Sequence, residues 1–430
     1  MENRCAVPSR EEYEAKHAQT HERRIAWWRE AKFGLFIHYG IYSCYGRGEW
    51  IKLREGISRE EYIRTANERM TYKSGTADEW ARCAVAAGMK YAILTTQHHD
   101  GFSLWDSRVN PYNSVNVGPG VDIVREFTDA CRRHGLRVGL YFSLLNWEHP
   151  DGDLCAHDEE ARHRFLADVK ERLRELMTGY GRIDVLWYDV ALPLDTAEKW
   201  ESVERNEMVR TLQPDILIND RSRLPEDFGI AEDSLAFQHL PRDWEGCLRF
   251  SETAFGGVDH ATARPFKKNA HDIVKCLSRC QFGGGNLVFN VSPNADGSLD
   301  GYESETLATV GRWVERHREA VYGDAMRWGS GSNGICTATR RENRVYLWNW
   351  CYTPGWMRIN GYQNSPKAVR CLSTGRAVDF RYEDGILYLL NLPDRSPDEI
   401  LDFTVFELDF KDEAPVYRML PPNLAKFANI

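Results

Sequence analysis

The chain has 430 residues, 42% of them hydrophobic and 28% charged, which is the composition of an ordinary globular protein. No apolar run approaches the roughly 20 residues that a membrane span needs, so we expect neither a membrane protein nor a disordered chain. The net charge of −9 argues against a nucleic-acid partner, because phosphate binding depends on Lys and Arg, and favours a neutral or weakly charged small ligand.

The first 28 residues are charged throughout and lack the apolar segment and small-residue cleavage site of a secretory signal. The 11 cysteines are scattered, with no C-x-x-C pair and no His-spaced zinc pattern. We therefore expect reduced thiols and a cytoplasmic protein.

Apolar strand-like runs then alternate with longer helical patterns. The predicted strands are residues 34–40, 91–101, 136–147, 184–190, 216–222, 247–255 and 286–293. The predicted helices are residues 78–88, 122–135, 159–181, 197–214, 269–285 and 304–323. Four of these helices are expected to end at a left-handed glycine, namely Gly88, Gly135, Gly181 and Gly285.

This alternation is typical of βα units around a parallel sheet. No G-x-G-x-x-G follows a strand, and polar side chains gather at strand ends instead. We therefore predict an α/β fold with a (β/α)8-like barrel over residues 1–325, irregular around its fifth and sixth strands. Short alternating runs then predict a β-sandwich over residues 326–411, followed by a surface tail over residues 412–430.

In such a barrel the active site lies at the carboxyl ends of the strands. The polar candidates there are His38, Glu49, Trp50, His98, His99, Asp100, Tyr141, Asn146, Trp147, Trp187, Asp189, Asn219, Asp220, Arg221 and Asn290. Asp189 closes a strand that is expected to be buried on both faces, where a carboxylate is costly unless it is paired or neutralised, so we expect Asp189 to have a function. For Asp220 we favour a simple ion pair or loop brace, whereas Arg221 could reach a ligand.

Two kinds of chemistry are disfavoured at these strand ends. His98 and His99 are adjacent on a strand, so their side chains should face opposite sides and cannot both reach one metal ion without a bend or bulge. No G-x-S-x-G serine motif is present. Carboxylates, histidines, an arginine and many aromatic rings together are typical of glycoside hydrolysis.

A series of segments in this order then gives a specific resemblance. They are KFGLFIHYG, GRGEW, GMKYAILTTQHHDGFSLWDS, VGLYFSLLNWEHPD, YGRIDVLWYD, ILINDRS, EDFGIAE and GGGNLVFNVSPNADG. Together they resemble the α-L-fucosidase family of retaining glycoside hydrolases (glycoside hydrolase family 29) over about residues 25–325. This family pairs a barrel-like catalytic domain with a C-terminal β-sandwich.

The resemblance implies roles for individual residues. Asp189 matches the nucleophile, and Glu232 matches the acid/base of a D-F-x-T-[AP]-E stretch, with Glu245 and Glu252 on later loops as alternatives. The positions that match the family's fucose pocket are His38, Glu49, Trp50, His98, His99, Tyr141, Trp187 and Arg221. Two segments depart from the family pattern: Tyr39 stands where the family usually has Trp, and CLRFSETAFGG (247–257) replaces a stretch with Asn, Asp and Trp.

The resemblance therefore implies an exo-acting α-L-fucosidase that works by double displacement with retention. Its partner would be a fucosylated oligosaccharide or glycoside, with no metal, no organic cofactor, no nucleic acid and no membrane. Glu232 is expected to fold back from a mobile loop over the barrel mouth to face Asp189. The alternatives are a relative specific for another sugar with a fucose-like hydroxyl pattern, and a carbohydrate-binding relative without turnover.

Overall fold

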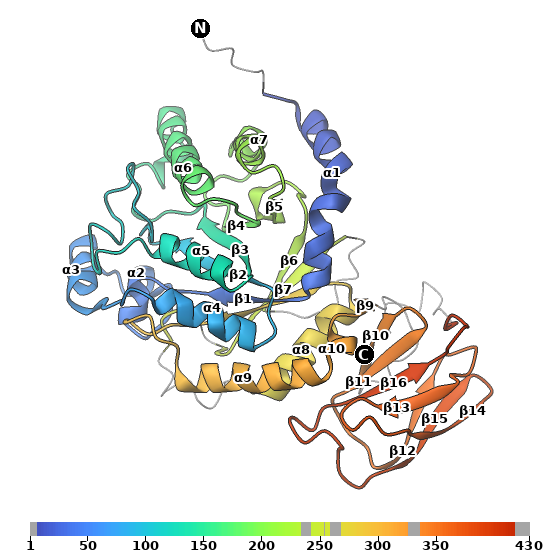
Figure 1. Ribbon diagram of the computed structural model, residues 1–430. Coiled ribbons are helices and arrows are strands. Elements are labelled where there is room, and N and C mark those ends of the chain that lie inside the picture. The colour runs from blue at the N-terminus through green and yellow to red at the C-terminus, as the bar shows by residue number, and fades with distance from the viewer. Residues whose placement is uncertain (1–6, 234–241, 253, 259–267, 326–335, 418–430) are drawn as a thin grey trace.

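The computed structural model describes residues 7–233, 242–252, 254–258, 268–325 and 336–417 (Figure 1). One parallel sheet has the strand order β5-β4-β3-β2-β1-β8-β7-β6. Its strands are β1 (Phe33–Ile37), β2 (Tyr91–Gln97), β3 (Arg137–Ser143), β4 (Val185–Asp189), β5 (Leu217–Ile218), β6 (Gly229–Glu232), β7 (Trp244–Arg249) and β8 (Asn286–Val291). The predicted barrel-like α/β fold is confirmed.

The two edge strands of this sheet, β5 and β6, meet through a short seam. Asn219 and Phe228 form an isolated parallel bridge. The backbone N–H of Asp227 donates to Ile218 O at 2.9 Å, and that of Asp220 donates to Phe228 O at 3.0 Å. The sheet therefore closes, although residues 219–228, all of them described, contain no α-helix. This is the irregularity that the sequence predicted around the fifth and sixth strands.

Helices surround the sheet in Figure 1. Those of the βα units are α4 (Thr76–Ala86), α5 (Ile123–Arg133), α6 (Glu159–Gly179), α7 (Ser202–Leu212), α8 (Ala270–Phe282) and α9 (Gly301–Arg316), followed by α10 (Arg318–Val321). Shorter insertions are η1 (Ile41–Cys44), α2 (Ile51–Arg54), α3 (Arg59–Arg69), η2 (Leu154–Ala156) and η3 (Asp220–Ser222). All six predicted helices are present, with ends that differ by a few residues.

The glycines that end three of these helices have positive φ as predicted, with 84° at Gly88, 71° at Gly135 and 70° at Gly181. At the end of α8 the prediction is wrong by one residue, because Gly284 has φ of 78°. Gly285 serves another purpose: a Cβ there would lie 2.4 Å from the ring of Trp244. The absent side chain lets that indole pack against the backbone.

The sequence pattern did not predict α1 (Arg10–Ala31), which closes the interior of the barrel. Ile25 and Trp28 of α1 belong to the same buried cluster as inward residues such as Val185 and Val288. Trp28 also stacks on Phe228 with ring centroids 5.0 Å apart. Helix α1 therefore packs beside the β5–β6 seam, where the chain supplies no helix of its own.

A buried charge network joins α1 to this seam. Asp227 binds Arg24 of α1 at 2.7 Å and Arg210 of α7 at 2.8 Å. His21 of α1 lies 3.1 Å from Asp227 and 3.6 Å from Asp243. Burial alone would raise the pKa of Asp227, but Arg210, His21 and Arg24 hold it below its usual value. Hydrogen bonds to the two aspartates raise the pKa of His21 to about 9.

The C-terminal part of the chain contains two antiparallel sheets with the orders β13-β16-β11-β10-β9 and β12-β15-β14. Their strands are β9 (Asp324–Ala325), β10 (Cys336–Arg341), β11 (Arg344–Asn349), β12 (Gly355–Asn360), β13 (Ala368–Cys371), β14 (Asp379–Glu383), β15 (Ile386–Leu392) and β16 (Thr404–Asp409). Side chains of both sheets share one core cluster, which makes a β-sandwich. In the tail, Tyr417 bridges Tyr362, and residues 418–430 lie outside the described residues.

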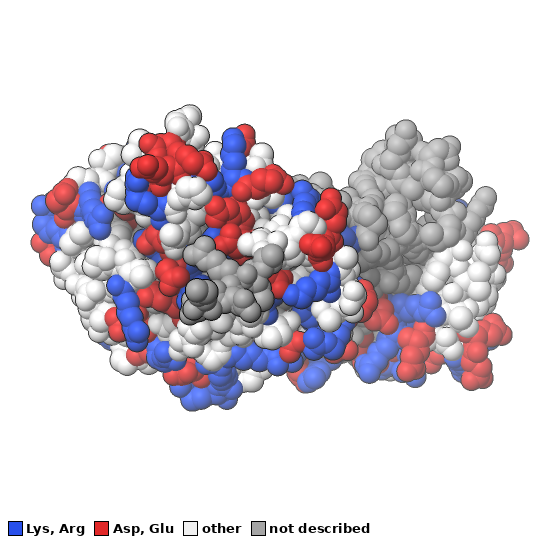
Figure 2. All heavy atoms as spheres, turned by 90° about the horizontal axis from the view of Figure 1, so that it is seen from above, with Lys and Arg blue, Asp and Glu red and all other residues white. Residues whose placement is uncertain are grey.

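The sandwich lies beside α8, α9 and α10 in Figure 1. Trp313 of α9 and Trp348 of β11 have ring centroids 5.4 Å apart, and the Trp313 indole N–H donates to Phe403 O at 3.0 Å. In the face seen in Figure 2, Lys and Arg are interspersed with Asp and Glu over the described part. No helix among the described residues is both long enough and apolar enough to span a bilayer.

Candidate active site

A cavity of about 120 Å³ opens at the carboxyl ends of the barrel strands. The described residues that line it are Phe36, His38, Glu49, Trp50, His98, His99, Tyr141, Trp187, Asp189, Val190, Arg221, Glu232, Cys247 and Phe255. The structure thus brings together all ten residues that the sequence assigned to catalysis or to sugar binding.

Two carboxyls in this cavity share one guanidinium. Asp189 is the last residue of β4, and its Oδ1 binds Nη1 of Arg221. Nη2 of the same Arg221 binds Oε2 of Glu232. Asp189 also accepts hydrogen bonds from the Tyr141 hydroxyl at 2.7 Å and from the Val190 backbone N–H at 2.9 Å. Every one of these groups is a donor, so the Asp189 carboxyl accepts hydrogen bonds on both of its oxygens.

Glu232 is the last residue of strand β6, so the expected mobile loop is wrong for this residue. It pairs with Cys247 of β7, another residue of the cavity. The sequence signal failed because β6 has four residues, GIAE, and so short a run carries little periodicity. Its position is set by pairing with β7, which a single segment does not reveal.

The hydrogen bonds of His38 and His99 show which ring nitrogens remain free. Asn290 donates its Nδ2–H to Phe255 O at 2.6 Å, so its Oδ1 accepts from His38 Nδ1 at 2.6 Å. Ser143 donates its hydroxyl to Leu145 O at 2.6 Å, so its oxygen accepts from His99 Nδ1 at 2.7 Å.

Both histidines therefore keep an unprotonated Nε2 as an acceptor. Burial lowers the pKa of His38 to about 3 and that of His99 to about 4, so both rings are neutral at ordinary pH. The Nε2 atom of His99 lies 3.8 Å from Asp189 Oδ2. Neutral imidazole acceptors beside a carboxylate suit ligand groups that donate hydrogen bonds, such as sugar hydroxyls.

His98 and His99 both line the cavity, with ring centroids 4.0 Å apart, so the expectation that they face opposite sides is wrong. The register of β2 against β3 shifts between Thr95 and Gln97, and the chain then turns, with Gly101 N–H donating to His98 O at 3.0 Å. The alternation of a regular strand has ended before the two rings. Within the described ranges, no three His, Cys, Asp or Glu side chains are grouped to hold a metal ion.

The loop after β7 forms one wall of the cavity and holds Glu49. The backbone N–H groups of Phe255 and Gly256 both donate to Glu49 Oε2 at 3.0 Å. Burial raises the pKa of Glu49. Trp50 packs edge-on against His99, with ring centroids 4.9 Å apart. The segment CLRFSETAFGG, which departs from the family pattern, thus supplies Cys247 and Phe255 to the cavity.

Tyr39, the other departure, points away from the cavity. Its hydroxyl donates to Ala295 O at 2.9 Å, and its ring packs against Tyr72 and Trp80 at 5.7 Å. Asp220 forms an ion pair with Arg242, which is the structural role that the sequence analysis favoured for it. Neither residue contributes to the described lining of the site.

The two alternative acids lie elsewhere. Glu245 belongs to strand β7 and not to a loop, and it is 0% exposed inside the barrel. Glu252 is exposed and does not line the cavity. Of the three glutamates considered from the sequence, Glu232 is the one that shares Arg221 with Asp189.

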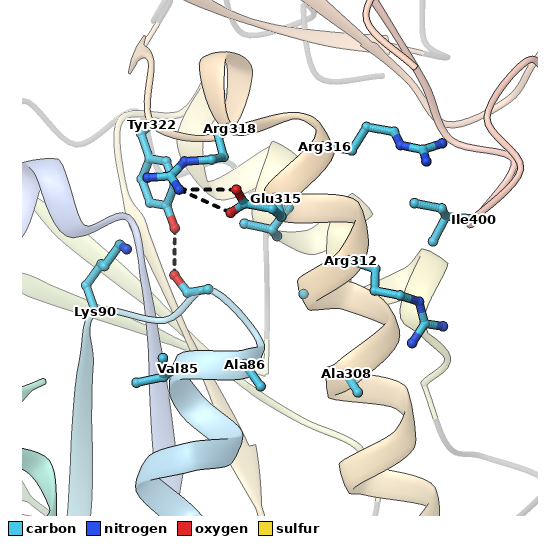
Figure 3. Close-up of a pocket in the computed structure, with 13 residues that line it drawn as sticks. Val85, Ala86, Lys90, Ala308, Arg312, Glu315, Arg316, Arg318, Tyr322 and Ile400 are labelled. Carbon is cyan, nitrogen blue, oxygen red and sulfur yellow. Dashed lines mark hydrogen bonds and ion pairs between the residues drawn. The ribbon is translucent and has the colours of Figure 1, made fainter. Parts of the chain in front are cut away.

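A larger cavity, of about 960 Å³, lies at the opposite end of the barrel, near the start of β2 (Figure 3). Among its described lining residues Glu315 is the single carboxyl, and it pairs with Arg318 at 3.2 Å. The Tyr322 hydroxyl donates to Gly88 O at 2.6 Å. A single paired carboxylate cannot supply the acid and the base of a hydrolase, so size does not identify the site here.

Four lining residues were not singled out from the sequence: Phe36, Val190, Cys247 and Phe255. Phe36 stands two positions before His38, so strand alternation could have indicated it. Cys247 and Phe255 stand in the sixth predicted strand run, residues 247–255, and nothing in their local pattern marks them as part of a site.

The site and fold define a glycoside hydrolase with a barrel and a C-terminal sandwich. The sequence profile described as Alpha-L-fucosidase matches residues 1–319. Tissue alpha-L-fucosidase of Mus musculus is 31% identical in an alignment 409 positions long, which covers 86% of this chain and 88% of that protein. Plasma alpha-L-fucosidase of Homo sapiens is 30% identical and covers 75% of each chain.

A solved structure gives the same result. Alpha-L-fucosidase isoenzyme 1 from Paenibacillus thiaminolyticus superposes with a TM-score of 0.82 at 31% identity, over 91% of this chain and 100% of that chain. The chain belongs to the α-L-fucosidase family, and the resemblance noted from the sequence is confirmed.

Proposed function

We propose that this protein is an exo-acting α-L-fucosidase that removes terminal α-linked L-fucose by double displacement. One observation carries the proposal: Asp189 and Glu232 bind the two terminal nitrogens of one guanidinium, that of Arg221, inside the cavity. Retaining enzymes hold their carboxyls about 5–5.5 Å apart, and a shared guanidinium keeps two carboxyls close. A cavity of about 120 Å³ suits one terminal sugar ring.

In the first step the Asp189 carboxylate attacks the anomeric carbon and forms a glycosyl ester. The Glu232 carboxyl turns from Arg221 towards the leaving oxygen and gives it a proton as the glycosidic bond breaks. In the second step Glu232 takes a proton from water, which attacks the same carbon and releases Asp189. Two inversions give net retention.

The remaining polar groups recognise the sugar. His38 and His99 accept hydrogen bonds from hydroxyls through Nε2, and Glu49 presents a buried carboxyl. Phe36 and Phe255 offer apolar surface to the C–H faces of the ring. The substrate is therefore a fucosylated oligosaccharide or glycoside, whereas the cytoplasmic location stays a prediction from the sequence.

The decisive experiment removes the nucleophile. Asp189→Ala should lower kcat on an aryl α-L-fucoside by about 10³-fold or more, because no covalent ester can form. Azide should enter the vacated space and give the inverted β-fucosyl azide, which NMR of the product identifies. Wild-type activity in Asp189→Ala would refute the assignment. Hydrolysis of another glycoside in preference to the fucoside would instead favour the alternative sugar.

A further inference from the structure

Glu245 is a carboxyl in the interior of the barrel that the proposed mechanism does not use. Its Oε1 accepts from the Tyr91 hydroxyl at 2.5 Å, and its Oε2 accepts from the Trp187 indole N–H at 3.1 Å. Both partners are neutral, and burial raises the pKa of Glu245 to about 7. An apolar side chain would fill this place without the cost of burying a carboxyl.

The surrounding barrel is shaped for this carboxyl. A Cβ on Gly34 would lie 2.4 Å from the Tyr91 ring, so the glycine leaves the space that this ring occupies. Glu245 precedes Cys247 by two positions on β7. Because inward side chains alternate along a strand, Glu245 lies one inward position below Cys247, which lines the cavity.

Trp187 connects Glu245 to the reacting groups. Its indole lines the cavity and stacks on Tyr141 with centroids 5.6 Å apart and an interplanar angle of 22°. Tyr141 donates its hydroxyl to Asp189 at 2.7 Å. The Arg221 guanidinium lies over the Trp187 ring at 5.3 Å from its centroid. The Trp187 indole thus contacts both Tyr141 and Arg221, and each of these two side chains binds Asp189 directly.

We propose that Glu245 is a positioning residue: its bond to Trp187 N–H fixes the indole on which Tyr141 and Arg221 rest, and thereby orients Asp189. The proposal rests on the proposed role of Asp189 as nucleophile. The second bond, to Tyr91, leads away from the cavity and supports the barrel interior only. The hydrogen bond of Glu245 to Trp187 therefore acts on the active site, whereas its hydrogen bond to Tyr91 does not.

The test compares three single variants on an aryl α-L-fucoside. Glu245→Leu removes both bonds and should lower kcat by between about 10-fold and 100-fold with a smaller change in KM, because small misplacements of reacting groups are costly. Glu245→Gln should stay within about threefold of wild type, since its amide oxygen can accept from Trp187 while its NH2 donates to the Tyr91 oxygen. Tyr91→Phe is the matched control, with the same threefold limit.

A double-mutant cycle shows whether Glu245 acts through the indole. Trp187→Phe keeps an aromatic ring but deletes the N–H group. In the Trp187→Phe background, adding Glu245→Leu should lower kcat by less than about a further threefold. If the two effects multiply in full, the carboxyl does not act through Trp187 and the proposal is wrong.

An NMR signature separates positioning from general support. The indole ¹H–¹⁵N resonance of Trp187, identified by its loss in Trp187→Phe, should move more in Glu245→Gln than in Tyr91→Phe. This comparison stands even if Glu245→Leu does not fold, and the reverse order overturns the proposal. Normal kcat in a folded Glu245→Leu, or an equal loss in Tyr91→Phe, also overturns it. The azide experiment on Asp189→Ala tests the nucleophile independently of Glu245.

Discussion

Removal of Glu232 should affect substrates according to their leaving groups. General acid–base catalysis contributes about 10²–10⁴-fold, so Glu232→Ala should lower kcat/KM on a natural fucosyl-sugar by about 10³-fold, equivalent to about 4 kcal/mol. On an aryl fucoside the phenolate leaves without a proton, so the first step should stay within about tenfold of wild type. The side chain of Glu232 is 34% exposed and its described partner is Arg221, so this loss is one of chemistry and not of folding.

The assay measures kcat/KM on both substrates and identifies the products by NMR. Azide should accelerate the second step in Glu232→Ala and give the α-fucosyl azide with retained configuration, opposite to the product of Asp189→Ala. Asp233→Asn is the matched control: Asp233 is the next residue, pairs with Arg249 and has φ of 56°, which Asn tolerates. Near-normal cleavage of the natural substrate by Glu232→Ala, with this pattern appearing in Glu252→Ala instead, would refute the assignment.

Other consequences concern the sugar pocket and the seam. His38→Ala should lower kcat/KM by about 10-fold to 100-fold, equivalent to about 1–3 kcal/mol for a lost acceptor. Dialysis against a chelator should leave wild-type activity unchanged. Loss of activity on chelation that zinc restores would contradict the role of the histidines in sugar binding. Asp227→Ala should lower the free energy of unfolding in urea by about 3–5 kcal/mol, because buried Arg24 loses the carboxylate that it binds, whereas Asp215→Ala at the exposed pair with Arg23 should cost at most about 1 kcal/mol. His21 has its pKa raised to about 9, so its charge stabilises the fold fully below about pH 6.5 and this contribution disappears as the pH rises through 9. The difference in melting temperature between wild type and His21→Gln should therefore be present at pH 6 and absent at pH 10, and a difference that grows with pH would contradict it.

Much of the fold was predictable because the local sequence pattern indicates most of the βα units. Strands such as β2 and β4 are buried along their whole length and begin with the apolar runs YAIL and VLWY, while the hydrophobic residues of the helices between them recur with a helical period. Site residues at the ends of long strands followed from the same logic, since barrel strands all point their carboxyl ends to one face. This rule predicts His38 and Asp189 as site residues from the sequence alone.

The sequence failed where tertiary pairing and not local pattern sets the structure. Strand β6 is four residues long, and Glu232 became recognisable through a family motif and not through periodicity. Helix α1 has charged residues on most of its surface, so its few buried side chains, Ile25 and Trp28 among them, gave no clear apolar stripe. The placement of His98 beside His99 depends on a register shift at the end of β2, which a single strand does not encode.

The position of the proposed acid depends on the least regular part of the barrel. Four residues of β6 offer few ladder hydrogen bonds, and the segment before it provides no helix to cover the seam. At the entry to β6, Asp227 is held by Arg24 and Arg210 from two different helices, and Phe228 is held by Trp28. Arg24 binds Oδ1 and Arg210 binds Oδ2 of the Asp227 carboxylate, and such charge-assisted hydrogen bonds restrict distance and direction more than apolar contacts do. Since β6 runs without interruption from this anchor to Glu232, the anchor acts together with the pairing of β6 against β7 in placing the acid relative to Asp189. A buried charge network that does not line the cavity is therefore part of what aligns the two carboxyls.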